Sequence, residues 1–350
     1  MNGPVLIMAG GTGGHIFPGL AVAQVLRERD VPVLWLGARS GMEGRLVPAQ
    51  QISLETVDFG GIRGKSLSTR LLAPLRLLRA VMQARRVLRK HSPRSVLSMG
   101  GYAAAPGGIA AWTKRIPVIV HEQNSVAGFT NRLLAHIARK SLTGFPDVFH
   151  GPRAEWVGNP VRPTIAELPS PAQRFAERSG PLRLLVLGGS QGAKTLNANV
   201  PLAMATLSPD RFEVRHQCGV QHIDATQQAY NAASVRASVF SFIDDMAEAY
   251  GWADLVICRA GALTIAELSA SGLGALLIPF PLAVDDHQTK NADALVKAGA
   301  ARLIADSQVT PQALADLIDQ ACSSRTKLLA MAEAARTLTR AGAAQRIADC

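Results

Sequence analysis

The sequence predicts an α/β fold in two halves, each built from a parallel sheet wrapped by helices. Apolar strand-like runs alternate with helical runs along the whole chain, which is the pattern of parallel sheets. A strand that runs into a glycine-rich turn and then a helix occurs twice, at residues 5–26 and 182–197. A chain of 350 residues is longer than a single hydrophobic core usually supports. Two domains of about 160–180 residues are therefore expected.

The predicted strands fall into two sets. Those of the first half span 4–9, 33–36, 52–57, 95–98, 117–121 and 155–157, and those of the second half span 182–187, 212–217, 237–242, 254–258, 275–279 and 301–304. Between the sets, Asn159 to Pro163 is the best hinge, because its two prolines lack N–H donors and end regular structure. The expected domains are residues 1–161 and 162–340.

The first glycine-rich turn, Gly10 to Gly14, lies between a strand and a helix. Glycines let backbone N–H groups approach a ligand, and a helix start favours negative charge. A dinucleotide-binding fold is the obvious alternative, and it requires an acidic residue at the end of the second strand to hold the ribose. Here that strand is followed by residues 37–39, and the nearest acid, Glu43, lies beyond its end. NAD binding is therefore disfavoured, and no cofactor is expected.

Residues 262–292 form the most diagnostic run of the chain. They predict a helix from Ala262 to Ser271, a buried strand, a proline-bounded loop and another helix. Thr264 and Glu267 share one helical face, and Gln288 opens the next helix. Loops at the carboxyl ends of strands line the ligand crevice of an open α/β sheet. These side chains therefore suit a sugar nucleotide, with Glu267 on the ribose hydroxyls and Thr264 and Gln288 on phosphate or sugar. The alternative is that Thr264 and Glu267 form a capping pair on an ordinary helix.

The positive charge of the chain is concentrated in its first half. Residues 1–162 carry 21 Lys/Arg against 8 Asp/Glu, and no acid lies between Asp58 and Glu122, where twelve Lys/Arg fall. This asymmetry indicates a polyanionic partner. Nucleic acid is disfavoured, because the window has few aromatic residues and no reading motif.

An anionic membrane surface fits the basic window better. The predicted helix 70–90 carries apolar and basic residues together, and several basic residues suffice for reversible docking on an anionic leaflet. The alternative is a crossover helix with a solvated basic face. The residues concerned are Leu71, Leu75, Leu78 and Met82, with Arg76, Arg79, Arg86 and Lys90 among them.

Other sequence classes are disfavoured by what the chain lacks. No apolar stretch approaches the roughly 20 uncharged residues of a spanning helix. The first strand has no basic region before it, unlike a signal peptide. The four cysteines show neither paired spacing nor a metal pattern, which suits a reducing cytoplasm. No Asp-x-Asp pair occupies a plausible loop position, so no metal site is predicted.

Six motifs occur in an informative order along the chain. They are GGTGGH at 10–15, MGGYAAAP at 99–106, HEQN at 121–124, GNPVR at 158–162, GGSQGA at 188–193 and the run 262–292. In this order they closely resemble the MurG family, bacterial transferases that add N-acetylglucosamine to the lipid-linked muramyl-pentapeptide precursor of peptidoglycan. The resemblance implies the glycosyltransferase B architecture, two Rossmann-like domains with parallel sheets facing across a cleft. It also implies that a last helix, within 341–350, packs back on the first domain.

The resemblance also implies substrates and a location. The expected reaction is inverting transfer from UDP-N-acetylglucosamine (UDP-GlcNAc) to the 4-hydroxyl of the muramyl sugar of undecaprenyl-pyrophosphoryl-MurNAc-pentapeptide. The first domain takes the acceptor and the membrane side, and the second binds UDP-GlcNAc. The enzyme is expected to be peripheral on the cytoplasmic face of the inner membrane, with other cell-wall enzymes as candidate partners. Two alternatives stay open: a UDP-sugar 2-epimerase of the same architecture, and a non-catalytic, membrane-docked UDP-sugar binder.

Roles follow for individual residues. His15 is the first choice for the general base, because histidine accepts a proton near neutral pH. Glu122 is the rival base, and His121 beside it is expected to be structural. Charge on the departing UDP is expected to be stabilised without metal by the Ser190 loop and by Arg162, whose alternative role is an interdomain salt bridge. The other substrate-binding residues implied by the family pattern are Thr12, Gly13, Gly14, Asn124, Asn131, Gln191, Ile243, Ala262, Leu263, Thr264, Ile265, Ala266, Glu267, His287 and Gln288.

Overall fold

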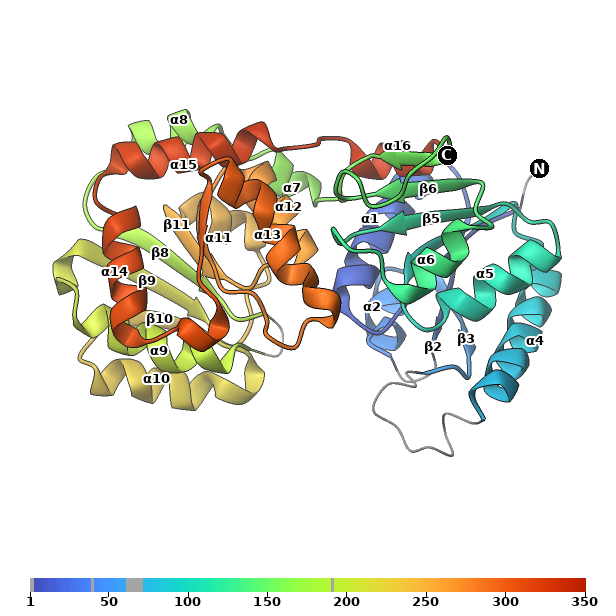
Figure 1. Ribbon diagram of the computed structural model, residues 1–350, viewed down its shortest axis with the longest axis horizontal. Helices are drawn as coiled ribbons and strands as arrows, with labels where there is room; N and C mark the ends of the chain where they lie inside the picture. Colours follow the sequence, from blue (N-terminus) through green and yellow to red (C-terminus); the bar gives the residue numbers. More distant parts are fainter. Residues whose placement is uncertain (1–2, 39–40, 61–71, 190–191) are drawn as a thin grey trace. The chain divides into compact units, whose positions relative to one another are not determined.

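The computed structural model describes residues 3–38, 41–60, 72–189 and 192–350. These residues form two compact units. One holds the described residues up to Pro160 together with Gly342–Cys350, and the other holds Val161–Ala341. Each unit has its own parallel sheet with helices on both faces (Figure 1). The predicted α/β class, with one parallel sheet in each half, is confirmed.

The first unit is built on seven parallel strands in the order β3-β2-β1-β4-β5-β6-β7. The strands are β1 (Val5–Ala9), β2 (Val33–Ala38), β3 (Ser53–Val57), β4 (Ser95–Gly100), β5 (Val118–Glu122), β6 (Lys140–Thr143) and β7 (Ala154–Trp156). The chain winds outward from β1 in one direction and then from β4 in the other. In such sheets ligands bind at the carboxyl ends of the strands beside this reversal.

Alternating residues of β1 enter two separate cores, because successive strand side chains point to opposite faces. Val5 and Ile7 belong to one core, and Leu6 and Met8 belong to the other. The first core is covered by α1 (Gly13–Glu28), α2 (Glu43–Ala49) and α16 (Ala343–Ala348), and the second by α4 (Ala73–His91), α5 (Ala104–Thr113) and α6 (Phe129–Ala135). The helix α16 comes from the end of the chain and packs on α1 (Figure 1).

The second unit has six parallel strands in the order β10-β9-β8-β11-β12-β13. They are β8 (Leu182–Leu187), β9 (Phe212–Gln217), β10 (Ala237–Phe240), β11 (Leu255–Cys258), β12 (Gly274–Leu277) and β13 (Ala301–Leu303). The α-helices are α7 (Pro163–Ala166), α8 (Pro171–Ala176), α9 (Lys194–Ala205), α10 (Ile223–Ala232), α11 (Met246–Trp252), α12 (Ala262–Ser271), α13 (His287–Lys297), α14 (Pro311–Ala321) and α15 (Arg325–Thr337). The 3-10 turns are η1 (Pro209–Arg211), η2 (Val220–His222), η3 (Val284–Asp286) and η4 (Asp306–Gln308).

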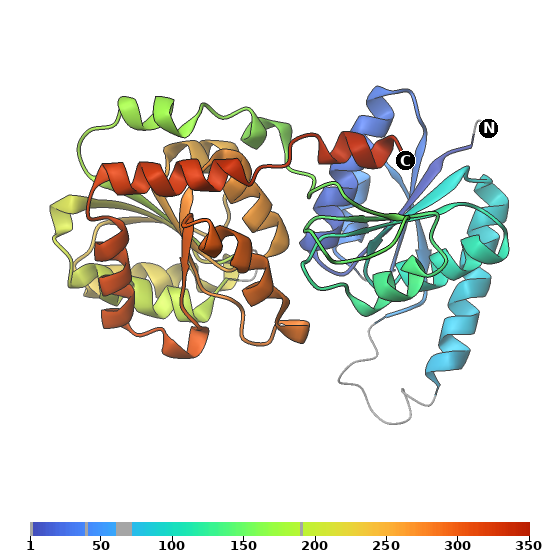
Figure 2. The same cartoon turned by 45° about the horizontal axis from the view of Figure 1, so that its top comes forward.

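Helices of the second unit form two layers. Helix α9 packs with α10 and α14 in one layer, and α12 packs with α13 and α15 in the other. Figure 2 shows the long red α15 running beside the green α8, with which it is in contact. This arrangement leaves the carboxyl ends of the strands to be lined by loops and helix starts.

One strand was missed by sequence reasoning. β6 has a single apolar residue, Leu142, between Lys140, Ser141 and Thr143, so no apolar run marks it. In the fold β6 pairs with both β5 and β7, and Ser141, Leu142 and Thr143 are buried. Tertiary packing, and not local composition, makes this segment a strand.

Two predicted boundaries also change. The first glycine-rich turn was expected to run to Gly14, but α1 begins at Gly13. The predicted helix 70–90 is α4, Ala73–His91, and Leu71 lies outside the described residues. Among the helices that the structure describes, none is both long enough and apolar enough to span a membrane.

Candidate functional site

Predicted residues of the first unit gather where β1, β4 and β5 end. Thr12 is the N-cap residue of α1, and its carbonyl accepts hydrogen bonds from the N–H groups of His15 and Ile16. Gly13 and Gly14 lie in the first turn of the helix, whose leading N–H groups have no partner within the helix itself. A helix start of this kind favours an anion such as a diphosphate.

The glycine-rich turn is braced by Glu43, a residue that sequence reasoning used only to argue against NAD. Glu43 is fully buried. Its Oε2 accepts from the N–H of Gly11 at 3.2 Å, and its Oε1 accepts from the N–H of Ala38 at 2.8 Å. One N–H of the turn is therefore occupied by the chain's own carboxylate, which joins the turn after β1 to the end of β2.

His15, the predicted base, is partly exposed in the first turn of α1. Its Nδ1 lies 2.9 Å from Oε1 of Gln123, which follows β5. Its ring also lies against Gly100 at the end of β4, where a Cβ atom would come within 3.0 Å of the imidazole. Gly100 has φ +102°, a conformation that favours glycine. Three strand ends thus fix the position of one imidazole.

Glu122, the rival base, is 1% exposed at the end of β5. Its Oε1 accepts from the backbone N–H of Asn124 at 3.0 Å, and its Oε2 accepts from the N–H of Gly128 at 3.1 Å and from Nδ2 of Asn131 at 2.9 Å. Both oxygens therefore hold the loop between β5 and α6. Abstracting a substrate proton would require this carboxylate to leave its buried bonds, so the geometry favours His15 as base.

The two amides predicted to contact sugar differ in their surroundings. Asn131 is 2% exposed, and its side chain bonds to Ser98 (2.9 Å), to the carbonyl of His121 (3.1 Å) and to Glu122. A contact with sugar would need those bonds to break, so Asn131 has a supporting position behind Glu122. Asn124 is only partly buried, and its Nδ2 donates to Glu122 at 3.2 Å.

His121 occupies the buried structural position that was expected for it. It is fully buried, and its Nε2 lies 3.0 Å from the carbonyl oxygen of Gly158. Burial lowers the pKa of His121 to about 4, with the carbonyl contact and nearby Glu122 acting in the opposite direction. The imidazole is therefore neutral at physiological pH.

In the second unit, Glu267 is held by two side chains. Its Oε1 pairs with Nη2 of Arg162 at 3.0 Å, and its Oε2 accepts from the hydroxyl of Tyr250 at 3.1 Å. Burial, and then the Glu267 carboxylate, hold the pKa of Tyr250 well above its usual range, so the phenol stays a donor. Arg162 and Glu267 belong to the same unit, so the ion pair of Arg162 is internal to that unit.

The alternative of a Thr264–Glu267 capping pair is wrong. The N-cap of α12 is Gly261, without a side-chain cap, and Glu267 is engaged by Arg162 and Tyr250 instead. Leu263, Thr264, Ala266 and Glu267 are partly exposed. The side chains of Ala262 and Ile265 are buried, so those two residues can offer a ligand only their backbone. The first N–H groups of α12 point out of the helix start, where they suit an anion.

Gln288 joins two loops at the carboxyl edge of the second sheet. Its Oε1 accepts from the N–H of Ala260 at 3.1 Å, after β11, and from the N–H of Phe280 at 2.9 Å, after β12. Neither bond uses its Nε2, which is a donor. His287, the first residue of α13, is partly exposed beside it.

The second glycine-rich turn is partly described. Ser190 and Gln191 lie outside the described residues. Gly189 is tied to Gln217 at the end of β9: its N–H donates to Oε1 at 3.0 Å, and its carbonyl accepts from Nε2 at 2.9 Å. Ile243 lies partly exposed in the loop after β10, also at the carboxyl edge.

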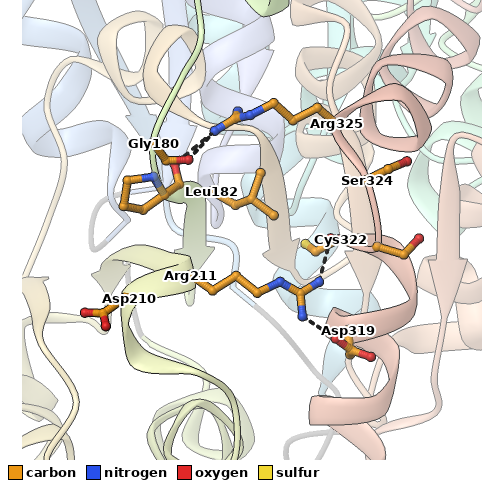
Figure 3. Close-up of a pocket in the computed structure, with 10 residues that line it drawn as sticks. Gly180, Leu182, Asp210, Arg211, Asp319, Cys322, Ser324 and Arg325 are labelled. Atoms are coloured by element: carbon orange, nitrogen blue, oxygen red, sulfur yellow. Dashed lines mark hydrogen bonds and ion pairs between the residues drawn. The ribbon is translucent and has the colours of Figure 1, made fainter.

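A separate pocket of about 600 Å³ lies at the opposite, amino edge of this sheet, where β8 and β9 begin (Figure 3). Its two arginines already have partners. Arg211 pairs with Asp319 and donates to the carbonyl of Cys322 at 2.7 Å, and Arg325 donates to the carbonyl of Gly180 at 2.6 Å. The amino edge is not where such sheets bind nucleotides, so this pocket is distinct from the predicted donor site. Within the described ranges, no group of three His, Cys, Asp or Glu is placed to hold a metal ion.

Gln123, Tyr250 and Gln217 are the supporting residues that sequence reasoning did not single out. Gln123 stands inside the HEQN motif, so its position was visible although its partner was not. Nothing in the local pattern marks Tyr250 or Gln217, because their partners lie 17 and 28 residues away.

Comparisons with known proteins give the class first. Residues 5–143 match the N-terminal domain of glycosyltransferase family 28, and residues 183–347 match its C-terminal domain. The glycosyltransferase of kitacinnamycin has the same fold, with a TM-score of 0.73 at 17% identity over 99% of this chain and 98% of that one. The chain is thus a family 28 glycosyltransferase with the glycosyltransferase B architecture.

Closer relatives define the particular family. The UDP-N-acetylglucosamine--N-acetylmuramyl-(pentapeptide) pyrophosphoryl-undecaprenol N-acetylglucosamine transferase of Xanthomonas campestris pv. campestris (strain 8004) is 55% identical over 346 residues, covering 99% of this chain and 81% of the relative. The protein of that name from Xylella fastidiosa (strain M12) is 54% identical, covering 99% and 94%. The crystal structure of Acinetobacter baumannii MurG matches with a TM-score of 0.87 at 40% identity, covering 99% and 98%. The chain belongs to the MurG family, as the six motifs indicated.

The epimerase alternative has only a shared fold in its favour. The UDP-GlcNAc 2-epimerase of Neisseria meningitidis matches with a TM-score of 0.66 at 13% identity. At this identity the likeness shows the fold alone.

Proposed function

We propose that this protein transfers N-acetylglucosamine from UDP-GlcNAc to the 4-hydroxyl of the muramyl sugar of undecaprenyl-pyrophosphoryl-MurNAc-pentapeptide, with inversion at the anomeric carbon. The observation that carries the proposal is 55% identity along 99% of the chain to proteins that bear the name of this transferase. The arrangement of the described residues supports a role for each unit.

The second unit is proposed to bind the donor. The carboxylate of Glu267, held by Arg162 and Tyr250, is suited to accept hydrogen bonds from two ribose hydroxyls. The leading N–H groups of α12 favour the diphosphate, and Nε2 of Gln288 is suited to donate to phosphate or sugar. Negative charge that develops on departing UDP is then stabilised by fixed backbone dipoles and by the guanidinium of Arg162.

The first unit is proposed to supply the base. As the acceptor oxygen forms its bond to the anomeric carbon, His15 takes the hydroxyl proton at Nε2, and the bond between that carbon and the UDP oxygen breaks with its electron pair. A single displacement of this kind inverts the anomeric configuration. His15 is suited to the role because it is partly exposed and its Nδ1 is anchored.

A membrane surface is proposed to receive the first unit through α4. Leu75, Leu78 and Met82 are 63%, 60% and 52% exposed, whereas a helix that only covers the sheet would bury its large apolar side chains. Arg76, Arg79 and Arg86 are exposed on the same helix. Lys90, also named from sequence, is paired with Glu55 at 2.8 Å. Exposed apolar side chains beside exposed arginines suit the headgroup region of an anionic leaflet, and we assign this surface to the cytoplasmic face.

A transfer assay tests the proposal. The protein is incubated with UDP-GlcNAc and a short-chain analogue of the lipid-linked acceptor, with and without a chelator. The expected result is a disaccharide product and UDP at the same rate in both. Conversion of UDP-GlcNAc to UDP-N-acetylmannosamine without acceptor would indicate the epimerase instead. UDP binding without turnover would indicate the non-catalytic binder.

A further inference from the structure

A chain of hydrogen bonds runs from His15 into the core of the first unit. Nδ1 of His15 lies 2.9 Å from Oε1 of Gln123. Nε2 of Gln123 lies 2.9 Å from the carbonyl oxygen of His121 and 3.1 Å from its Nδ1. Nε2 of His121 lies 3.0 Å from the carbonyl oxygen of Gly158. Gln123 is 1% exposed and His121 is fully buried, so water does not compete for these bonds.

The carbonyl oxygen of Gly158, at the buried end, determines which group donates in each hydrogen bond of this chain. A carbonyl oxygen only accepts, so His121 must carry its proton on Nε2 to bond Gly158. Burial lowers the pKa of His121 to about 4, so its Nδ1 has no proton at neutral pH and is an acceptor.

The orientation of the Gln123 amide follows. The group that faces His121 meets two acceptors, the carbonyl oxygen and Nδ1, so it must be the NH₂ group. The amide oxygen therefore faces His15. Since that oxygen only accepts, Nδ1 of His15 must be the donor.

We propose that Gln123 is a positioning residue that holds His15 in the Nδ1–H tautomer and leaves the lone pair of Nε2 for the acceptor hydroxyl. The catalytic part of this inference rests on the proposed function, in which His15 is the base. The tautomer itself does not, because it follows from the bonds of the resting protein. A free neutral imidazole favours the other tautomer, in which Nε2 carries the proton and is no longer a base.

Two further contacts keep this chain of hydrogen bonds in place. Nδ2 of Asn159 donates to the backbone carbonyl of Gln123 at 2.9 Å, which fixes the backbone that carries the amide side chain. Gly100, with its positive φ, leaves room for the imidazole ring of His15, as described above. Once His15 has taken the substrate proton, its bond to Oε1 of Gln123 becomes charge-assisted and therefore stronger. Gln123 thus acts on the transition state as well as on the resting tautomer.

Nitrogen NMR of the full-length protein labelled with ¹⁵N-histidine tests the tautomer without any activity. The His15 signals are assigned by their loss in His15→Gln. We expect wild-type His15 to be protonated at Nδ1 and bare at Nε2 near pH 7.5. Gln123→Met, which has a similar shape and no amide, is expected to move the proton toward Nε2. A wild-type signal with the proton on Nε2 would overturn the proposal, even if Gln123→Met does not fold.

Kinetics test the link to catalysis. Gln123→Met is expected to lower kcat about 10- to 100-fold, the range for a lost hydrogen bond to a charged group, and to leave the Kd for UDP unchanged. In a His15→Ala background the same substitution is expected to cost less than about twofold, because groups that act as a unit are not additive. Equal losses in both backgrounds would assign Gln123 a structural role that does not act through His15. A normal rate for His15→Ala beside the expected NMR result would refute the base and leave the tautomer assignment intact.

Discussion

Replacing Glu267 by alanine separates nucleotide binding from folding, because the structure sets a magnitude for each. The carboxylate is 16% exposed and is proposed to accept from the ribose hydroxyls. A hydrogen bond to a charged group is worth about 1.5–3 kcal/mol, so Glu267→Ala should raise the Kd for UDP by about 10- to 150-fold. Affinity for the acceptor should not change.

The same substitution also lowers stability, by an amount that can be measured separately. The hydroxyl of Tyr250 is buried and would lose its hydrogen bond to Glu267, which costs about 1–3 kcal/mol in the free energy of unfolding. Arg162 is 47% exposed, so loss of its ion pair should contribute at most about 1 kcal/mol. Glu267→Gln is the matched control, because its amide oxygen still accepts from Tyr250. It should recover most of the stability and only part of the UDP affinity.

Titration calorimetry with UDP and urea unfolding measure the two effects separately. A Glu267→Ala protein that unfolds cooperatively and binds UDP with the wild-type Kd would refute the ribose assignment. Equal weakening of UDP and acceptor binding would point to a general distortion of the protein instead.

Three further predictions concern the base, the membrane surface and pH. His15→Ala should lose about 100-fold or more in turnover with the Kd for UDP unchanged, and a near-normal rate would transfer the role of base to Glu122 or to water. Charge reversal of three exposed arginines on α4 should weaken binding to anionic vesicles by on the order of 100-fold at low salt, and added salt should weaken binding of the wild-type protein. If neither change alters vesicle binding, the basic face of α4 is exposed to solvent and does not dock on a membrane. The residues reversed are Arg76, Arg79 and Arg86. The free energy of unfolding should fall as pH is lowered from about 6.5 to about 4, because the unfolded chain protonates His121 in this window while the folded chain keeps it neutral. His216, whose pKa burial lowers to about 3, acts in the same direction, so His121→Gln should reduce this slope in urea unfolding without abolishing it.

Local sequence determined the elements that carry the site. Apolar runs and glycine-rich turns gave the strands and the helix starts that follow them, and the run 262–292 specified α12 to the residue. Local sequence could not reveal β6, because Leu142 is its single apolar residue. This segment becomes a strand because it is buried between β5 and β7. The family resemblance then supplied roles for residues whose chemistry alone left alternatives open.

Tertiary structure decided which side chains meet. His15 and Gln123 are 108 residues apart, and Arg162 and Glu267 are 105 apart, so no periodicity in the sequence connects either pair. In the sequence, Glu43 only lies beyond the position expected for a ribose-binding acid. In the fold, its carboxylate accepts a hydrogen bond from the N–H of Gly11 and so supports the first glycine-rich turn. The physical reason is the order of the strands. A parallel sheet brings all its carboxyl ends to one edge, and the order in which strands pair there depends on long-range packing, which no local window of the sequence contains.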